Sequence, residues 1–302
     1  MNWMWKIALG LVTAIVCSIV FAALPLLVQT GRDGLALNWS APAHAIADYF
    51  RGWESGASFR FRTGKTEHLF FDQIWGYATV SLQYSALAAL VGTTLGVLAG
   101  VRMAGVRKLW VKQSLELLAL IPDFILILWL QLAVVVIYKQ TGWRMAKVAS
   151  LSVDDPAILL PLLTMTLIPA LYIMRSVSVH THQVLTEDYM LTAKAKGLPR
   201  LYAYLYHVVP NVLPFLKAEL HKLTAIIVGN LFIMEYLFNL RGLTKLLLSS
   251  GFTTTNLTNG MFSGYQFNLT VNCFFVFMLL YMVLYGIMLS YIRVIEKRLR
   301  HE

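Results

Sequence analysis

Six apolar stretches, most of them long enough to cross a lipid bilayer, constrain this chain more than any other feature of its sequence. A membrane-spanning helix needs about 20 mostly apolar residues, because each residue adds 1.5 Å and the hydrocarbon core is about 30 Å thick. The stretches are residues 5–28, 78–101, 115–138, 158–174, 223–238 and 269–292. Lipid cannot hydrogen-bond an unpaired backbone, and six strands are too few to close a barrel. The sequence therefore predicts an all-α membrane protein with six transmembrane helices.

The fourth and fifth stretches are the shortest. The fourth contains Pro161 and Pro169, which we expect to kink it. The fifth follows a charged segment, residues 217–222, that we interpret as a separate amphipathic helix leading into the membrane.

The composition excludes a soluble enzyme or nucleic-acid-binding protein. Hydrophobic residues make up 58% of the chain and charged residues only 13%, whereas soluble domains carry about 25% charged residues. The two cysteines, Cys17 and Cys273, lie inside apolar stretches and predict neither a disulfide framework nor a metal cluster. The first stretch is too long for the core of a signal peptide, so we expect it to be a retained membrane helix.

The net charge of +10 is distributed unevenly over the loops. Most of the 25 Lys and Arg residues fall on the side of the membrane that holds both termini and the loop after the fourth span. Because loops facing the cytoplasm carry the excess of Lys and Arg, both termini and that loop are predicted to be cytoplasmic.

This topology divides the chain into three parts: a first transmembrane helix (1–28), an extracytoplasmic segment (29–76), and a core of five transmembrane helices (77–302) with a cytoplasmic loop at 175–216. Nine aromatic residues in the extracytoplasmic segment favour an ordered cap over a flexible loop. In the second span, small residues recur every four positions and predict a face that another helix can approach closely. These residues are Ala88, Gly92, Gly96 and Gly100.

The cytoplasmic loop has the signals of two short helices. Thr186 is a predicted N-cap, with Glu187 and Asp188 in the first turn. Gly197 is a predicted left-handed C-cap, and Pro199 suits the start of a second helix. The pattern predicts a helix-turn-helix at the membrane surface, which either docks into a groove of another protein or lies on lipid.

The amino-acid sequence of this loop is specific to a protein family. Residues 187–198 read EDYMLTAKAKGL and residues 207–214 read HVVPNVLP. They resemble the EAA loop of ABC importer permeases, and most closely that of the dipeptide, oligopeptide and nickel branch. Residues 235–243 read EYLFNLRGL and are similar to a motif of the B-type subunit of that branch. The chain departs from the family at Arg241, where proline is usual, at Thr244, where glycine is usual, and in lacking the usual R-L-x-P-G-D-P after the first span.

The resemblance implies the fold of an ABC type I importer permease and a coupling loop that contacts a separate ATPase. The implied coupling residues are Glu187, Asp188, Tyr189, Thr192, Ala193, Lys194, Ala195, Lys196, Gly197, His207 and Asn211. Ala193 and Gly197 would be small so that the helix can lie close to the ATPase. The implied partners are a second permease subunit, two ATP-binding subunits and an extracellular substrate-binding lipoprotein in a bacterial cytoplasmic membrane.

The sequence contains no G-x-x-x-x-G-K-[ST] phosphate-binding loop. We therefore expect no catalytic residue and no cofactor in this chain, and ATP and magnesium on the partner subunits. The implied transport substrate is a peptide or a related small solute. The alternatives left open are a self-sufficient secondary transporter or channel, and a permease of the same family for nickel or another metal chelate.

Polar residues at membrane depth are costly and mark either a transport path or hydrogen bonds between helices. Asp123, Asn230 and Glu235 are the candidates for the translocation path, and the sequence leaves both interpretations open for each. The histidines have no carboxylate or thiolate neighbours that would form a metal site with them, so no metal ligand is predicted.

Overall fold

The computed structural model describes residues 3–31, 34–106, 110, 114, 117, 121–152, 154–251 and 264–300. Within them the chain is mostly helical, and six helices are long and apolar enough to cross a membrane. They are Ala8–Leu27, Phe70–Ala104, Asp123–Thr141, Leu159–Leu185, Tyr206–Leu237 and Phe267–Leu299. The number and order of the spans are as the sequence predicts. The predicted start of the third span, at residue 115, lies outside the described residues.

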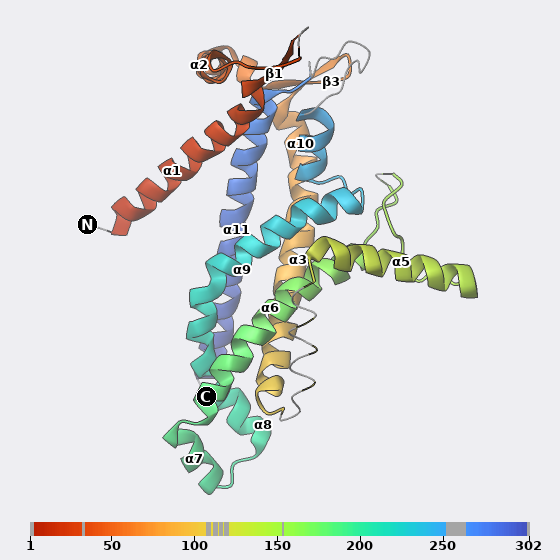
Figure 1. Ribbon diagram of the computed structural model, residues 1–302. Helices are drawn as coiled ribbons and strands as arrows, with labels where there is room; N and C mark the ends of the chain where they lie inside the picture. The colour runs from red at the N-terminus through yellow and green to blue at the C-terminus, as the bar shows by residue number, and fades with distance from the viewer. Residues whose placement is uncertain are drawn as a thin grey trace. The chain divides into compact units, whose positions relative to one another are not determined.

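The chain divides into two compact units, one formed by Met1–Val80 and Arg241–Leu280 and the other by Ser81–Leu240 and Tyr281–Glu302. The helices of the first unit include α1 (Trp3–Ala23), η1 (Leu24–Leu27), α2 (Ser40–Ser55), η2 (Ala57–Phe59) and α10 (Leu243–Gly251). Its strands are β1 (Val28–Gly31), β2 (Gly34–Leu37), β3 (Arg60–Thr63) and β4 (Thr66–Leu69). The second unit holds α5 (Asp123–Thr141), α6 (Leu159–Leu185), α7 (Asp188–Ala195), α8 (Arg200–Ala203), the π-helix η3 (Tyr204–Val208) and α9 (Val209–Leu237). The long helices α3 (Phe70–Ala104) and α11 (Phe267–Arg300) contribute to both units (Figure 1).

In the first unit, the segment expected to form an ordered cap contains α2 and parts of two antiparallel hairpins, β1–β2 and β3–β4. The hairpins correct the all-α expectation, since short alternating strands leave too weak a pattern beside six membrane helices. The buried Tyr49 of α2 donates a 2.7 Å hydrogen bond to Oδ1 of Asn272 in α11. Gln266 binds both the N–H and the C=O of Arg62 in β3. These bonds fix the cap to the start of α11.

In the second unit, α6 packs along α9, and α5 packs against both. The small-residue face of α3 contacts α6, as the four-residue spacing predicts. A Cβ atom added at Gly96 would lie 2.6 Å from Cβ of Ile173, and one added at Gly100 would lie 2.8 Å from Cβ of Val177. Helix α3 therefore approaches α6 so closely that only glycine fits at these positions.

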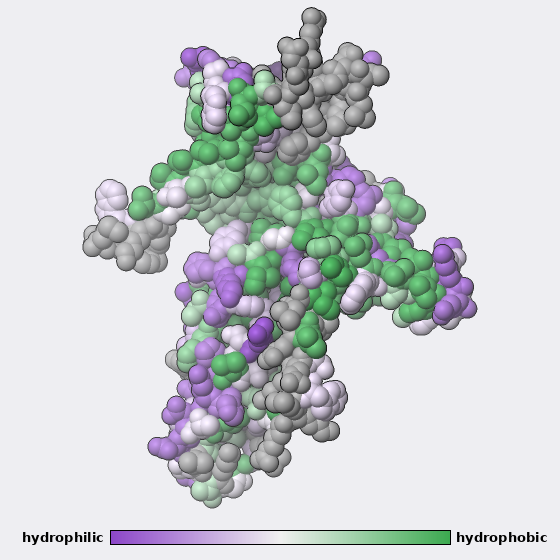
Figure 2. Space-filling model, in the orientation of Figure 1, coloured by the Kyte–Doolittle hydropathy of each residue, from purple (hydrophilic) through white to green (hydrophobic). Residues whose placement is uncertain are grey.

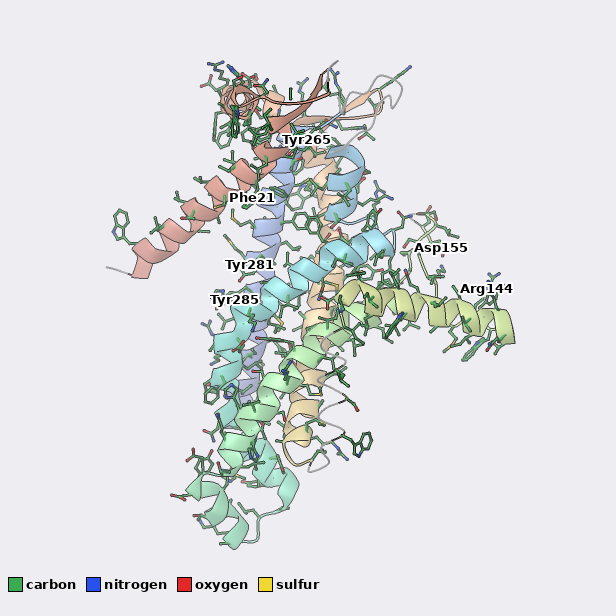
Figure 3. All side chains as sticks on the ribbon, viewed as in Figure 1. Phe21, Arg144, Asp155, Tyr265, Tyr281 and Tyr285 are labelled. Carbon is green, nitrogen blue, oxygen red and sulfur yellow. The ribbon has the colours of Figure 1, made fainter. Side chains whose placement is uncertain are left out.

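The charged residues 217–222 lie within α9, and this corrects the prediction of a separate amphipathic helix. The helix can continue through them because several of their charges have partners. Lys217 forms an ion pair with Glu296 of α11, and Tyr172 of α6 donates a hydrogen bond to Glu219. The ring of His221 stacks on Tyr285 of α11, and its Nδ1 lies 3.1 Å from the hydroxyl of Tyr281 (Figure 3).

Figure 2 shows mainly hydrophobic side chains along α1 and α5, with hydrophilic ones at the far end of α5. This pattern is typical of helices whose sides face lipid.

Candidate functional site

The loop after α6 begins with a helix end that differs from the predicted one. Thr186 is the C-cap of α6, and its hydroxyl donates a 2.7 Å hydrogen bond to the carbonyl of Gln183. Because α7 starts at Asp188, the residue preceding it is Glu187, and the predicted N-cap role of Thr186 is wrong. Asp188 still lies in the first turn, where a carboxylate is stabilised by the positive end of the helix dipole.

The other end of α7 closes as the sequence predicts. Gly197 has φ +71°, in the left-handed region, and the N–H of Leu198 donates to the carbonyl of Ala193 at 3.3 Å. This is the long-range bond of a Schellman motif, which glycine favours because it has no Cβ to clash.

Burial divides α7 into two faces. Met190 and Ala193, three residues apart, are buried, with Ala193 only 5% exposed. The opposite face carries exposed residues at the spacing of a single helix surface. They are Asp188, Tyr189, Thr192, Ala195 and Lys196, and Glu187 beside them is also exposed. The side chain of Lys194 lies outside what the structure describes.

The burial of Ala193 corrects one expectation. Its small side chain permits close packing within this chain and is not available to a partner. The position that remains small and exposed is Gly197, where an added Cβ would meet no atom within 4 Å. At the start of α7, burial and the carboxylate of Glu187 raise the pKa of Tyr189, so its phenol stays a hydrogen-bond donor.

The second helix of the loop does not end as a separate helix, as it would in a free helix-turn-helix. The N–H of Ala203 donates to the carbonyl of Pro199 at 3.0 Å, which starts α8. Helix α8 continues through the π-helical turn η3 into α9, the fifth span (Figure 1). The polar loop and the membrane span therefore share one nearly continuous helix.

His207 and Asn211, both predicted coupling residues, lie at this π-turn. The side-chain amide of Asn211 donates a 2.6 Å hydrogen bond to the carbonyl of His207. The N–H of Val209 bonds to the carbonyl of Tyr204, five residues back, and Pro210 has no N–H to donate. Asn211 thus supplies a side-chain donor where the regular helical ladder is interrupted. Tyr202 and Tyr206 contact each other on the preceding turn, with ring centroids 4.6 Å apart.

The three candidate path residues do not lie together. Glu235 is 1% exposed and accepts a hydrogen bond from the hydroxyl of Ser81 in α3, so in this structure it joins two helices and does not face an open cavity.

Asp123 and Asn230 do lie together. Asp123 starts α5 and its carboxyl interacts with the side chain of Asn230 in α9. Asn230 is 5% exposed. Its Nδ2 has no hydrogen-bond partner within the described part of the chain, so the contact with Asp123 is not a hydrogen bond from that atom.

Sequence reasoning missed the polar residues around this pair. A pocket of about 260 Å³ between α5, α6 and α9 is lined by Asp123, Tyr172, Arg175 and apolar side chains. On α9, the ammonium of Lys222 lies 5.0 Å from the centre of the Tyr172 ring. The signal was present in the helical spacing of Glu219, Lys222 and Asn230, which places them on one face of α9. Within the described residues no group of three or more His, Cys, Asp or Glu side chains could hold a metal ion.

Six candidate spans, with a helical loop that continues into one of them, define a polytopic membrane protein. The chain belongs to the family of binding-protein-dependent transport system inner membrane components, which matches residues 92–301. It is therefore a permease component of the inner membrane, a transport subunit and not an enzyme. The family places it in a multicomponent system, and not among the self-sufficient transporters that the sequence left open.

Two curated relatives carry the names of peptide permeases. The chain is 30% identical over 166 residues to the dipeptide transport system permease protein DppB of Bacillus subtilis, covering 54% of this chain and 51% of that protein. It is 24% identical over 177 residues to a candidate peptide transport system permease of Brucella suis biovar 1, covering 57% and 56%. The chain thus spans about half the length of the curated relatives it matches.

A solved structure supports the fold. A chain of the MetNI methionine ABC transporter, in inward-facing conformations, matches with a TM-score of 0.53 at 16% identity, covering 74% of this chain and 95% of that one. At this identity the likeness concerns the fold alone.

Proposed function

We propose that this chain is the translocating subunit of an ATP-driven ABC importer for peptides or a related small solute delivered by an extracellular binding protein. Its partners would be a second, different permease subunit, two ATP-binding subunits and a substrate-binding lipoprotein. ATP and magnesium would bind to the ATP-binding subunits, and none to this chain. The similarity to a dipeptide permease and to a candidate peptide permease supports the peptide class.

The observation that carries this proposal is the path from α7 to α9. Helix α7 exposes one face with the E-D-Y-x-x-T-A-x-A-K-G pattern, and the chain then continues through α8 and the π-turn into the fifth span. A partner that moves α7 would therefore also move α9, which bears Asn230. Because π-turns interrupt the regular helical ladder, this turn is a natural place for the helix to bend.

In this proposal both termini and α7 face the cytoplasm, where ATP is available. The exposed residues Glu187, Asp188, Tyr189, Thr192, Ala195 and Lys196 would contact the ATPase, together with Gly197. Ala193 would support α7 from within, and His207 and Asn211 would shape the turn that transmits the movement.

The first test is composition. The chain is extracted from its native membrane in a mild detergent, purified through an affinity tag, and its copurifying proteins are identified by mass spectrometry. We expect two ATPase copies with phosphate-binding loops, a second permease, and ATP hydrolysis in the eluate. Purification of a stable oligomer of this chain without any ATPase would overturn the proposal.

The second test separates coupling from folding. Gly197 and Gly142 have almost the same left-handed backbone, with φ of +71° and +70°, and an added Cβ would meet no atom at either position. Substitution by aspartate should therefore cost a similar folding free energy at both positions, but Gly142 caps α5 and lies outside the coupling loop. We expect Gly197→Asp to insert normally and to lose about tenfold or more of ATP-dependent uptake, a change of about 1.4 kcal/mol or more in coupling.

Gly142→Asp is the matched control and should retain uptake. Uptake at the wild-type rate in Gly197→Asp, or an equal loss in both variants, would contradict a coupling role for α7.

A further inference from the structure

The pocket between α5, α6 and α9 holds two opposite charges that do not pair with each other. Asp123 and Arg175 both line it, and neither forms an ion pair with any of the residues that the structure describes. Four side chains of α6 face it from one helix surface: Ile168, Leu171, Tyr172 and Arg175. The remaining lining residues are Ile121, Leu126 and Ile226, so the wall between the charges is apolar.

The neighbouring polar groups are already satisfied. Tyr172, which lines the pocket, donates to Glu219, and Lys222 lies over the Tyr172 ring, so these three groups form one interacting set. The charges of Asp123 and Arg175 remain outside that set. A carboxylate in an apolar span is costly and is generally found where it has a function, and Asp123 lies in such a span.

A structural role explains only part of this arrangement. Asp123 lies in the first turn of α5, where the helix dipole stabilises a carboxylate. That does not explain the buried Asn230 beside it, whose Nδ2 has no partner among the described side chains and backbone. A buried donor without a partner is unfavourable, and Asn230 adjoins Asp123 without itself lining the pocket.

We propose that this pocket is a binding site for a short zwitterionic ligand, whose ammonium group contacts Asp123 and whose carboxylate contacts Arg175. Arginine suits this position because its planar guanidinium can bind a carboxylate with two parallel hydrogen bonds. The apolar wall accepts aliphatic side chains. This inference rests on the proposed transport function and specifies which chemical groups of a peptide the chain recognises.

The test uses the purified complex, with its copurified ATPases and without the binding protein, so that selection by the binding protein does not contribute. The probes are alanyl-alanine, its N-acetyl derivative and its C-terminal amide, and binding is measured by calorimetry. We expect each blocked probe to bind about tenfold to a hundredfold more weakly than free alanyl-alanine, because each lacks one charge-assisted contact.

Two variants locate the contacts. Asp123→Asn should remove the discrimination against the N-acetyl probe and leave that against the amide, and Arg175→Gln should do the reverse. The matched controls, Asp155→Asn and Arg144→Gln, change exposed charges in the segment between α5 and α6 (Figure 3) and should change neither.

The outcomes separate this inference from the proposed function. Three outcomes would overturn the zwitterion site: equal binding of the three probes to the wild-type complex, no binding at all, or an equal loss of binding for all probes in both variants. In each case a complex with active ATPases would still support the transport function. A preparation without ATPases would overturn the transport function itself. The comparison of probes on the wild-type complex decides the inference even if a variant fails to assemble.

Discussion

Gly96 offers a sharp test of how closely α3 and α6 pack. In Gly96→Ala the new Cβ would lie 2.6 Å from Cβ of Ile173 and 2.8 Å from the carbonyl oxygen of Ala170. Neither atom can rotate away, because one belongs to the backbone and the other is the first atom of a side chain. The two helices must therefore separate to accept a single methyl group.

The expected magnitude is a difference of two effects. Alanine is more favourable than glycine within a helix by about 1 kcal/mol. Overpacking of a tight interface costs about 1–3 kcal/mol, and contacts below 3.0 Å on two sides fall at the upper end. We expect a net loss of about 2 kcal/mol for Gly96→Ala.

Three other glycines of α3 calibrate this loss. Gly100 has a closest contact of 2.8 Å and Gly92 one of 2.9 Å, whereas a Cβ at Gly76 would meet no atom within 4 Å. The loss of stability should therefore decrease from Gly96→Ala through Gly100→Ala to Gly92→Ala. Gly76→Ala should be neutral or slightly stabilising.

The assay is thermal unfolding of the detergent-purified protein, followed by tryptophan fluorescence, with protease resistance as a second measure. If Gly96→Ala were as stable as the wild type, while Gly76→Ala showed that the assay detects helix propensity, the close contact between α3 and α6 would be refuted.

Two further predictions concern polar contacts that hold helices together. Glu296→Gln leaves the partly buried Lys217 without its ion pair and should reduce the stability of the fold by about 1–3 kcal/mol. Asp48→Asn breaks an exposed ion pair and should cost less than about 1 kcal/mol. Equal shifts of the unfolding temperature in the two variants would argue against a structural role for the ion pair between α9 and α11. Tyr49→Phe removes the hydrogen bond to the buried Asn272 and should destabilise the cap by about 1–3 kcal/mol. The measurement is amide hydrogen exchange, which should become faster in α2. Unchanged exchange would show that the cap is held by packing alone.

The sequence by itself determined the membrane spans and the end of α7. Six long apolar stretches must be helices in lipid, because only a helix satisfies its own backbone there. Gly197 ends α7 because a left-handed residue without a Cβ closes a helix, and this is a local rule that needs no tertiary contact. The four-residue spacing of small side chains likewise predicted the contact face of α3, although it could not name α6 as the partner.

The sequence motif of the loop predicted which residues take part in coupling, but not which of them are buried and which are exposed. Ala193 and Lys196 belong to the same motif, yet one is buried and the other exposed, because only packing within the folded chain distinguishes the two faces of α7. The fusion of the loop with α9 also escaped prediction, since the charges at 217–222 read as a helix outside the membrane until their partners on α6 and α11 are known.

The tertiary structure alone decided which polar residues share a site. Glu235 and Asp123 look equivalent in the sequence, as single carboxylates in apolar stretches. The fold places Glu235 against Ser81 between two helices, and places Asp123 in a pocket with Arg175 and next to Asn230, residues from three different helices. Whether a charge at membrane depth joins helices or faces a ligand depends on which side chains surround it, and those neighbours come from distant parts of the chain.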